Sequence, residues 1–193
     1  MQTSVSFLDS LRNDPSEQQW QMLTDLYSPL IRGWLIRSGA VSSDLDDLTQ
    51  DVLIVVVRRF PEFRREPQAG AFRSWLRTIT VNCLRDHWKR RKRQPVALGG
   101  TDFAAVIEQL SDPQSALSQL WDNEHNACVS AYLLNQIRSN TSESTWRAFQ
   151  RFALDGLSAD EVARELGVSA NSVFIAKSRV MASLRKLGKG LIE

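Results

Sequence analysis

The feature of this sequence that most restricts its fold is a helix start, a glycine stop and a second helix start, all near the C-terminus. Ser158-Ala-Asp-Glu161 has the spacing of a capping box, and Gly167 is the residue type that commonly ends a helix. A second helix is expected from about Ser169 to Leu187. A short helix, a glycine turn and a longer helix are typical of a helix-turn-helix, which places its second helix in the DNA major groove.

Similar signals predict helices along most of the remaining chain. Asp14-Pro15-Ser16-Glu17 offers an N-cap at Asp14 with proline at the first helical position, and Gly39 can end that helix. The run Val52–Val57 is β-branched enough for a buried strand, but the helical apolar spacing that precedes it favours a helix. The other predicted helices run from Ser42 or Ser43 to just before Pro61, and from about Ala71 to Arg93, Pro113 to Arg138 and Asn140 to Gly156. We therefore predict an all-α fold.

A change of composition divides the chain into two parts. The stretch from Gln94 to Asp112 contains a proline and two glycines and has little apolar periodicity, which is typical of an extended linker. We expect two small helical domains, residues 1–94 and 113–193, joined by an extended linker over 95–112. The second domain contains the predicted helix-turn-helix.

Charge alternates along the chain although the net charge is only +2. Residues 1–57 carry 3 basic and 8 acidic side chains, whereas residues 58–93 carry 12 basic and 3 acidic ones. Residues 94–130 hold 5 acids and no Lys or Arg, and residues 131–193 hold 9 basic and 6 acidic side chains. Two basic blocks separated by an acidic one indicate two surfaces that each meet a polyanion, or else solvated helix faces.

Several classes of protein are excluded by what the sequence lacks. It has no apolar run of about 20 residues to span a bilayer and no secretory signal, so we expect a cytoplasmic protein without membrane contact. Cys83 and Cys128 lie far apart without zinc-site spacing and are expected to be buried small hydrophobes. His87 and His125 form no catalytic motif, so neither an enzyme, nor a metal, nor a cofactor is expected.

The helix predicted from Ala71 onward interleaves basic and aromatic side chains. Basic residues bind phosphate and aromatic faces stack on unpaired bases, a combination suited to single-stranded nucleic acid. Phe72 and Trp75 are equally compatible with a place in the core, and the cluster Lys89-Arg-Arg-Lys-Arg93 is equally compatible with a solvated helix end.

The order of these segments resembles the sigma-70 type factors, and specifically their compact extracytoplasmic-function group. The resemblance to the second conserved region of the family rests on Asp46-Asp-Leu-Thr-Gln-Asp-Val-Leu53, Phe63, Phe72-Arg-Ser-Trp-Leu-Arg-Thr-Ile79, Asn82 and Asp86-His-Trp-Lys-Arg-Arg91. Leu157 to Leu187 resembles the fourth region. The resemblance implies a sigma factor that binds the RNA polymerase core through the β′ clamp helices and the β flap, and that recognises promoter DNA. It also allows an anti-sigma factor as a partner.

The resemblance implies a role for each matching residue. The residues implied to bind core polymerase are Asp46, Asp47, Leu48, Gln50 and Asp51, although acids in a first helical turn are also favoured by the helix dipole. Those implied to hold the minus-ten strand and its extruded base are Arg64, Arg65, Gln68, Phe72, Arg73, Trp75, Arg77, Asn82, Arg85, Lys89 and Arg90. Those implied to read the minus-thirty-five element are Ser169, Ala170, Asn171, Ser172, Phe174, Ile175, Lys177, Ser178 and Arg179. The acidic linker is implied to thread the polymerase interior near the RNA exit path.

The chain departs from the family pattern at one place. Phe174-Ile175-Ala176 stands where the family often has a basic, polar triplet, and Lys177-Ser178-Arg179 follows three residues later. Phe174 or Ile175 can touch a thymine methyl group or can pack against the domain.

Two other readings compete with a sigma factor. A helix-turn-helix regulator that does not act as a sigma subunit explains residues 129–193 but not Asp46–Arg93. An RNA-binding protein can use the basic aromatic helix but has no need of a separate major-groove reader.

Overall fold

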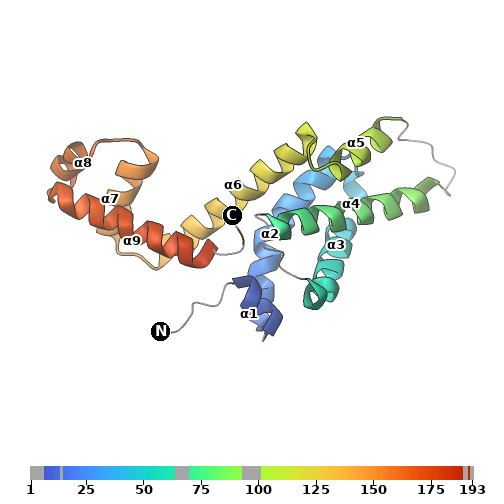
Figure 1. Cartoon of the computed structure of the whole chain (residues 1–193), viewed down its shortest axis with the longest axis horizontal. Coiled ribbons are helices and arrows are strands. Elements are labelled where there is room, and N and C mark those ends of the chain that lie inside the picture. Colours follow the sequence, from blue (N-terminus) through green and yellow to red (C-terminus); the bar gives the residue numbers. More distant parts are fainter. Residues whose placement is uncertain (1–6, 14, 64–69, 93–100, 189–190, 192–193) are drawn as a thin grey trace. The chain divides into compact units, whose positions relative to one another are not determined.

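The computed structural model describes residues 7–13, 15–63, 70–92, 101–188 and 191. Every regular element in this part of the chain is helical, which confirms the all-α prediction (Figure 1). The β-branched run Val52–Val57 lies inside helix α3 (Leu45–Arg59), so the strand alternative is wrong. The chain divides into two compact units, which we call the N-terminal unit, mainly residues 8–129, and the C-terminal unit, mainly residues 130–189.

The N-terminal unit is built from α1 (Phe7–Asn13), α2 (Glu17–Arg37), α3, α4 (Ala71–Lys92), α5 (Thr101–Ser111) and the first half of α6 (Ala116–Ser139). Short 3₁₀ turns precede and follow α3 at Ser42–Asp44 and Phe60–Glu62. Helix α3 packs against both α2 and α4, and α5 packs against α4. These contacts place α3 and α4, which carry the residues of interest, in one packed body.

Local features define both ends of α2, hydrogen bonds at its start and a glycine conformation at its end. The Ser16 hydroxyl accepts a bond from the Gln19 N–H at 3.3 Å, and the Gln19 side-chain oxygen accepts one from the Ser16 N–H at 2.8 Å. The cap is therefore Ser16, and the prediction of Pro15 as first helical residue is wrong, while Asp14 lies outside the described residues. At the other end Gly39 has φ +79°, as predicted for a residue that ends a helix.

One face of each helix supplies the core of the N-terminal unit. Helix α2 buries Leu23, Tyr27, Ile31 and Trp34 at helical spacing. Helix α3 buries Leu48, Val52 and Val56, and α4 buries Phe72, Leu76, Ile79 and Leu84. Truncating one such leucine to alanine typically costs about 2–5 kcal/mol of stability. The exposed residues of α3 and α4 keep their positions because the buried face of each helix is packed in this core.

The expected extended linker is wrong for the part that the structure describes. Residues 101–111 form α5, which buries Ile107 and Leu110 and packs against α4. The proline and glycines that suggested a linker lie in 93–100, outside the described residues. The predicted boundary at residue 113 also differs from the structure, because the two units divide within α6, between Val129 and Ser130.

The first half of α6 belongs to the N-terminal unit because it carries a buried stripe of its own. Trp121, His125 and Val129 recur every fourth residue, and each is fully buried. The Trp121 ring lies 5.0 Å from the Trp34 ring of α2, measured between centroids. Trp121 is therefore part of the core of the N-terminal unit, which explains why this unit continues past the predicted domain start at residue 113.

The C-terminal unit contains the second half of α6, α7 (Glu143–Phe149), a π-helical turn (Gln150–Leu154), α8 (Ala159–Leu166) and α9 (Ala170–Gly188). The N-cap of α7 is Ser142, whose hydroxyl accepts from the Thr145 N–H, so the helix begins at Glu143 and not at Asn140 as predicted. Ile137, Trp146, Phe149 and Val180 form one core cluster that joins α6, α7 and α9.

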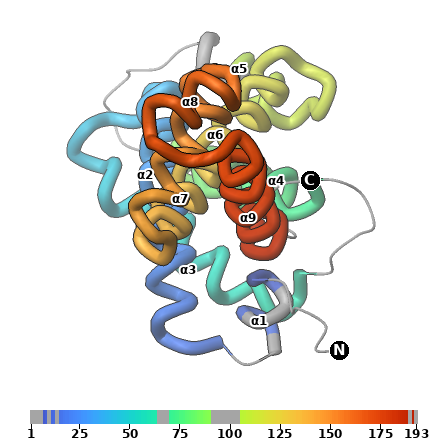
Figure 2. Tube along the Cα trace, turned by 90° about the vertical axis from the view of Figure 1, so that its left-hand side faces the viewer, coloured from blue at the N-terminus to red at the C-terminus, as the bar shows by residue number. Residues whose placement is uncertain are grey.

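The helix–glycine–helix prediction agrees with the local structure of α8 and α9. Ser158 and Glu161 form a reciprocal capping box, and Gly167 has φ +66° at the end of α8. The turn between α8 and α9 can be followed in Figure 2. Val162 of α8 and Val173 of α9 are both fully buried in one cluster, which fixes the crossing of the two helices.

Candidate nucleic-acid interface

The exposed face of α3 combines acidic, polar and apolar side chains. Asp47 and Gln50 are exposed, and Ile54 is 38% exposed one turn beyond Gln50 on the same face. Leu48 is only 2% exposed and lies in the core. The face therefore offers Asp47, Gln50 and Ile54 to a partner, whereas Leu48 cannot make the contact predicted for it in this arrangement.

The other two acids of α3 have basic partners within the N-terminal unit. Asp46 pairs with Arg32 of α2, and its side chain is still 88% exposed. Asp51 lies 3.9 Å from Arg90 of α4, a distance at which an exposed pair contributes about 0–1 kcal/mol. Both acids therefore stay available to an outside partner at little cost.

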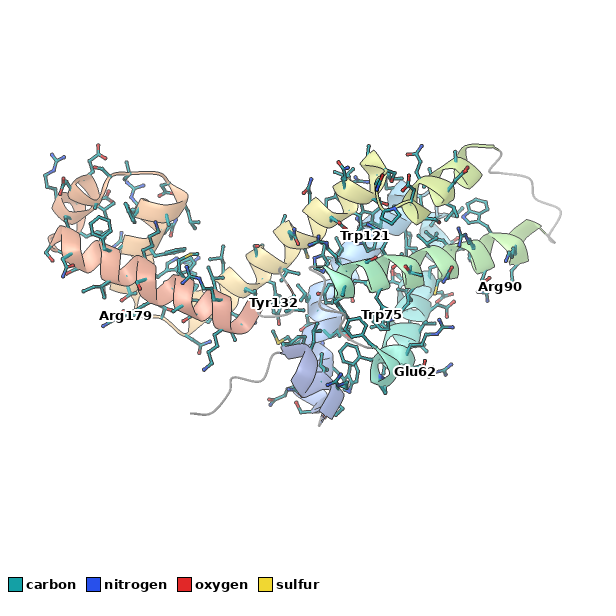
Figure 3. The ribbon with its side chains drawn as sticks, in the orientation of Figure 1. Glu62, Trp75, Arg90, Trp121, Tyr132 and Arg179 are labelled. Atoms are coloured by element: carbon teal, nitrogen blue, oxygen red, sulfur yellow. The ribbon has the colours of Figure 1, made fainter. Side chains whose placement is uncertain are left out.

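Four aromatic rings pack together where α4 begins. Phe60, Phe63, Phe72 and Trp75 have ring centroids 5.0–6.1 Å apart, in tilted and edge-on arrangements. Phe72 is 3% exposed, whereas Trp75 is partly exposed and can be located on α4 in Figure 3. Phe72 thus belongs to the core, and of the two aromatic residues predicted to hold the minus-ten strand only Trp75 is partly exposed.

Two arginines of α4 bind an acid of α6 instead of pointing into solvent. Arg73 Nε lies 3.2 Å from one carboxylate oxygen of Asp122, and Arg77 Nη1 lies 3.1 Å from the other. Arg77 Nη1 also donates to the Ser118 carbonyl at 3.3 Å, and its side chain is 5% exposed. Burial lowers the pKa of Arg77, an effect that Asp122 partly opposes. Arg77 therefore joins α4 to α6 and presents no surface to DNA here.

Gly70 lies directly beside the Arg73 side chain of this ion pair. Its φ is +78°, and a Cβ at this position would lie 2.5 Å from the Arg73 guanidinium carbon. The backbone conformation favours glycine here, and a Cβ would also force the end of the Arg73 side chain to shift.

The second half of α4 keeps its polar and basic side chains accessible. Asn82, Lys89 and Arg90 are exposed, and Arg90 is visible on α4 in Figure 3. Arg85 is partly exposed and donates to the Ser111 hydroxyl of α5 at 2.7 Å. This half of the helix is the part of the predicted minus-ten surface that can meet a phosphate.

The outward side of α9 carries most of the residues predicted to read DNA. Ser169 lies just before its first residue, and the Ser169 hydroxyl accepts from the Ser172 N–H at 3.2 Å. The exposed residues of this segment are Ser169, Asn171, Ser172, Phe174, Ile175, Lys177, Ser178 and Arg179, and Ala170 is partly exposed. All nine predicted residues therefore lie on α9 or, in the case of Ser169, directly before it.

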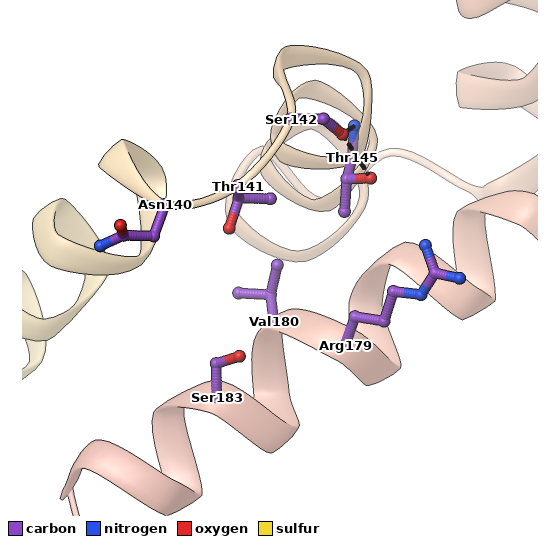
Figure 4. A pocket seen from close by; sticks show the side chains of 7 residues that line it. All are labelled: Asn140, Thr141, Ser142, Thr145, Arg179, Val180 and Ser183. Carbon is purple, nitrogen blue, oxygen red and sulfur yellow. Dashed lines mark hydrogen bonds between the residues drawn. The ribbon is translucent and has the colours of Figure 1, made fainter.

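A small cleft lies between the α6–α7 turn and α9 (Figure 4). Hydroxyl groups and one guanidinium dominate its lining, which consists of Asn140, Thr141, Ser142, Thr145, Arg179, Val180 and Ser183. Hydroxyls and guanidinium are donors that suit a phosphate oxygen. Arg179 therefore serves both the outward side of α9 and this cleft.

Three predicted residues, Arg64, Arg65 and Gln68, lie outside the described part of the chain.

The structure also adds residues that the sequence prediction missed, Asp122 and His125. The His125 Nε2 lies 3.3 Å from the Tyr27 hydroxyl, and the two rings stack with centroids 5.6 Å apart. Burial lowers the pKa of His125 to about 4. The apolar stripe through Trp121 and Val129 was the available signal, since it predicts that this face of α6 is buried.

None of the helices in the described part of the chain combines the length and apolar character that crossing a membrane requires. The described elements define an all-α protein with an acidic and apolar face on α3, a basic face on α4, and a capped helix pair in a separate unit.

The family model and the relatives that match this chain all belong to sigma factors. Residues 23–94, from α2 to beyond the end of α4, match the family model described as Sigma-70 region 2. The chain is 29% identical to the ferric citrate uptake sigma factor FecI of Escherichia coli over 166 residues, which cover 83% of this chain and 87% of FecI. It is 25% identical to the ECF RNA polymerase sigma factor SigE of Mycolicibacterium smegmatis, over 96% of this chain and 66% of SigE. It is 27% identical to the ECF RNA polymerase sigma factor BldN of Streptomyces coelicolor, over 86% of this chain and 58% of BldN.

Residues 23–94 therefore match sigma-70 region 2, and the relatives that align over most of the chain are sigma factors, two of them named as ECF RNA polymerase sigma factors.

Proposed function

We propose that the protein is a dissociable promoter-specificity subunit of bacterial RNA polymerase, without catalysis of its own. One observation carries the proposal: a single packed unit presents an acidic and apolar face on α3 and an exposed basic face on α4. A protein that only binds DNA has no use for the first face. The relatives are sigma factors, which supports this function over that of a helix-turn-helix regulator. Its place of action is then the cytoplasm, where the polymerase works.

The α3 face is proposed to dock on the clamp helices of the β′ subunit. Asp47 and Gln50 can pair with basic and amide groups, and Ile54 adds apolar area that becomes buried on association. Asp46 and Asp51 add charge at the rim, where it affects the association rate more than affinity. Leu48 supports this face from below, because it is buried.

The basic half of α4 is proposed to hold the opened minus-ten strand. Lys89 and Arg90 can pair with phosphates, Asn82 can bond to base edges, and Trp75 offers a ring on which a base can stack. Extruding a base costs a few kcal/mol, which these contacts must offset. Arg73 and Arg77 act indirectly, because their ion pairs with Asp122 fix the position of α4.

Helix α9 is proposed to read the minus-thirty-five duplex in the major groove. Asn171 and Ser172 lie in its first turn, and Lys177 and Arg179 supply charge further along. The hydroxyl-lined cleft beside Arg179 is proposed to receive a backbone phosphate at the edge of the site. The other proposed partners are the β flap of the polymerase and an anti-sigma factor, which would bind this protein when it is inactive.

The experiment measures core binding and promoter binding separately on surface variants. The double variant Asp47→Asn/Gln50→Ala should bind core polymerase at least tenfold more weakly, because it removes two central contacts. Its affinity for DNA should equal that of the native protein. The matched double variant Lys177→Gln/Arg179→Gln should bind core normally but bind promoter DNA more weakly, with a shallower salt dependence.

Two results would contradict the proposal. If the native protein binds no core polymerase while it still binds DNA, the helix-turn-helix regulator is the better account. If both double variants lose both activities, the surfaces are not separate.

A further inference from the structure

Helix α9 presents a large apolar side chain in the middle of its polar, outward side. Ile175 is 43% exposed, and it lies one turn from both Asn171 and Arg179, which are also exposed. On the opposite side of the helix Val173, Ala176 and Val180 are at most 5% exposed and form the core. Ile175 thus points away from the packing of its own unit.

Folding alone does not explain an isoleucine at this position. Isoleucine is a poorer helix former than the lysine and arginine that follow at Lys177 and Arg179, and its exposure means that it contributes little apolar burial. Its neighbour Phe174 is 52% exposed, but it has a packing role, because its ring meets Phe152 edge-on at 5.4 Å. Lys177 Nζ lies 5.0 Å from the centre of the same Phe152 ring. Phe152 therefore holds the Phe174 ring against its own unit.

We propose that Ile175, with Phe174 beside it, reads the 5-methyl group of a thymine in the minus-thirty-five element. This inference rests on the proposed function, in which α9 enters the major groove. Thymine is the base that presents a methyl group there, and apolar side chains are its natural contact. Lys177 and Arg179 flank the apolar pair, and their charge suits a polyanion, which favours DNA over an apolar protein as the occupant.

The test removes the methyl group from the DNA and the side chain from the protein. Holoenzyme made from the full chain and core polymerase first selects duplexes from a pool randomised upstream of the start site. Each thymine of a selected minus-thirty-five element is then replaced in turn by deoxyuridine, which lacks only the 5-methyl group. Loss of one buried methyl contact should weaken binding by the native protein about fourfold at one position.

The variant Ile175→Ala should lose about the same factor on the thymine duplex and become insensitive to deoxyuridine at that position. Leu154→Ala is the matched control, because Leu154 is a 52% exposed apolar residue in the π-helical turn and not on α9. It should keep the native response to deoxyuridine. Circular dichroism confirms that each variant is folded.

The outcomes separate this inference from the proposed function. If the native holoenzyme selects no sequence, the proposed function fails. If it selects promoters but deoxyuridine has no effect at any position, or Ile175→Ala stays as sensitive as the native protein, only the thymine contact is overturned.

Discussion

His125 makes the stability of the N-terminal unit depend on pH in a way that can be calculated. Its side chain is fully buried against Tyr27, and burial lowers its pKa from 6.5 to about 4. Between these values the unfolded chain binds a proton that the folded chain does not bind. Acid therefore favours unfolding, and the contribution of His125 is fully present above pH 6.5 and is lost as the pH falls towards 4.

The size of the effect follows from the difference between the two pKa values. One unit corresponds to about 1.4 kcal/mol, so a lowering from 6.5 to about 4 is worth about 3 kcal/mol when it is fully expressed. At about pH 5 the folded protein is still mostly unprotonated at His125, and about 2 kcal/mol of stability has been lost relative to about pH 7.

Urea unfolding followed by tryptophan fluorescence measures this loss, because 5 of the 6 tryptophans lie in the N-terminal unit. The native protein should lose about 2 kcal/mol more than His125→Gln between about pH 7 and about pH 5. Other titrating groups are common to both proteins and cancel in this comparison. Equal losses in the two proteins would refute the argument, because His125 would then have the same pKa folded and unfolded.

Three further predictions concern stability and salt. Asp122→Asn leaves the buried Arg77 without a charged partner and should lower the free energy of unfolding, measured in urea, by about 3 kcal/mol. The exposed control Asp25→Asn should change this free energy by less than about 0.5 kcal/mol, and similar values for the two variants would contradict the role given to the ion pair. Gly167→Ala should destabilise the protein by about 1 kcal/mol because the φ of Gly167 is +66°, whereas Gly33→Ala, in open space on α2, should stabilise it by up to about 1 kcal/mol. Thermal melting tests this, because the melting temperature should fall for Gly167→Ala and rise for Gly33→Ala. Lys177→Gln should reduce the slope of log affinity for promoter DNA against log salt by about 0.9, and an unchanged slope would exclude a phosphate contact at this side chain.

The helices followed from the sequence because their caps and apolar stripes are local signals. The Ser158–Glu161 capping box and the glycine at Gly167 both act within a few residues, and both took the predicted form. The cap of α2 was misplaced by two residues because Asp14 and Ser16 are equally good capping residues, and only the Gln19 side chain decides between them.

The contacts of α5 and α6 could not be predicted in the same way. Phe103, Val106, Ile107 and Leu110 recur at helical spacing, but this short pattern follows a proline and two glycines and was therefore read as part of a linker. In the structure Ile107 and Leu110 are buried, and α5 packs against α4. Trp121 and His125 form a stripe in the sequence, but their partners Trp34 and Tyr27 lie 87 and 98 residues earlier in the chain. Sequence spacing predicts that a face is buried, and it does not predict which helix covers it.

The same limit applies to the candidate interface. Residue type alone made Phe72 and Arg77 as suitable for DNA as Lys89, and burial separates them. Asp122 was read as part of an acidic block, whereas it is the partner of two predicted DNA-binding arginines.

Transcription from a genomic template pool by purified core polymerase tests the central claim most directly. Core polymerase alone should start at no defined position. Addition of this protein should give transcripts with discrete starts, and Asp47→Asn/Gln50→Ala should abolish them without loss of DNA binding. If the native protein binds both DNA and core polymerase and still starts no transcript from any template, the account of it as a sigma factor is contradicted.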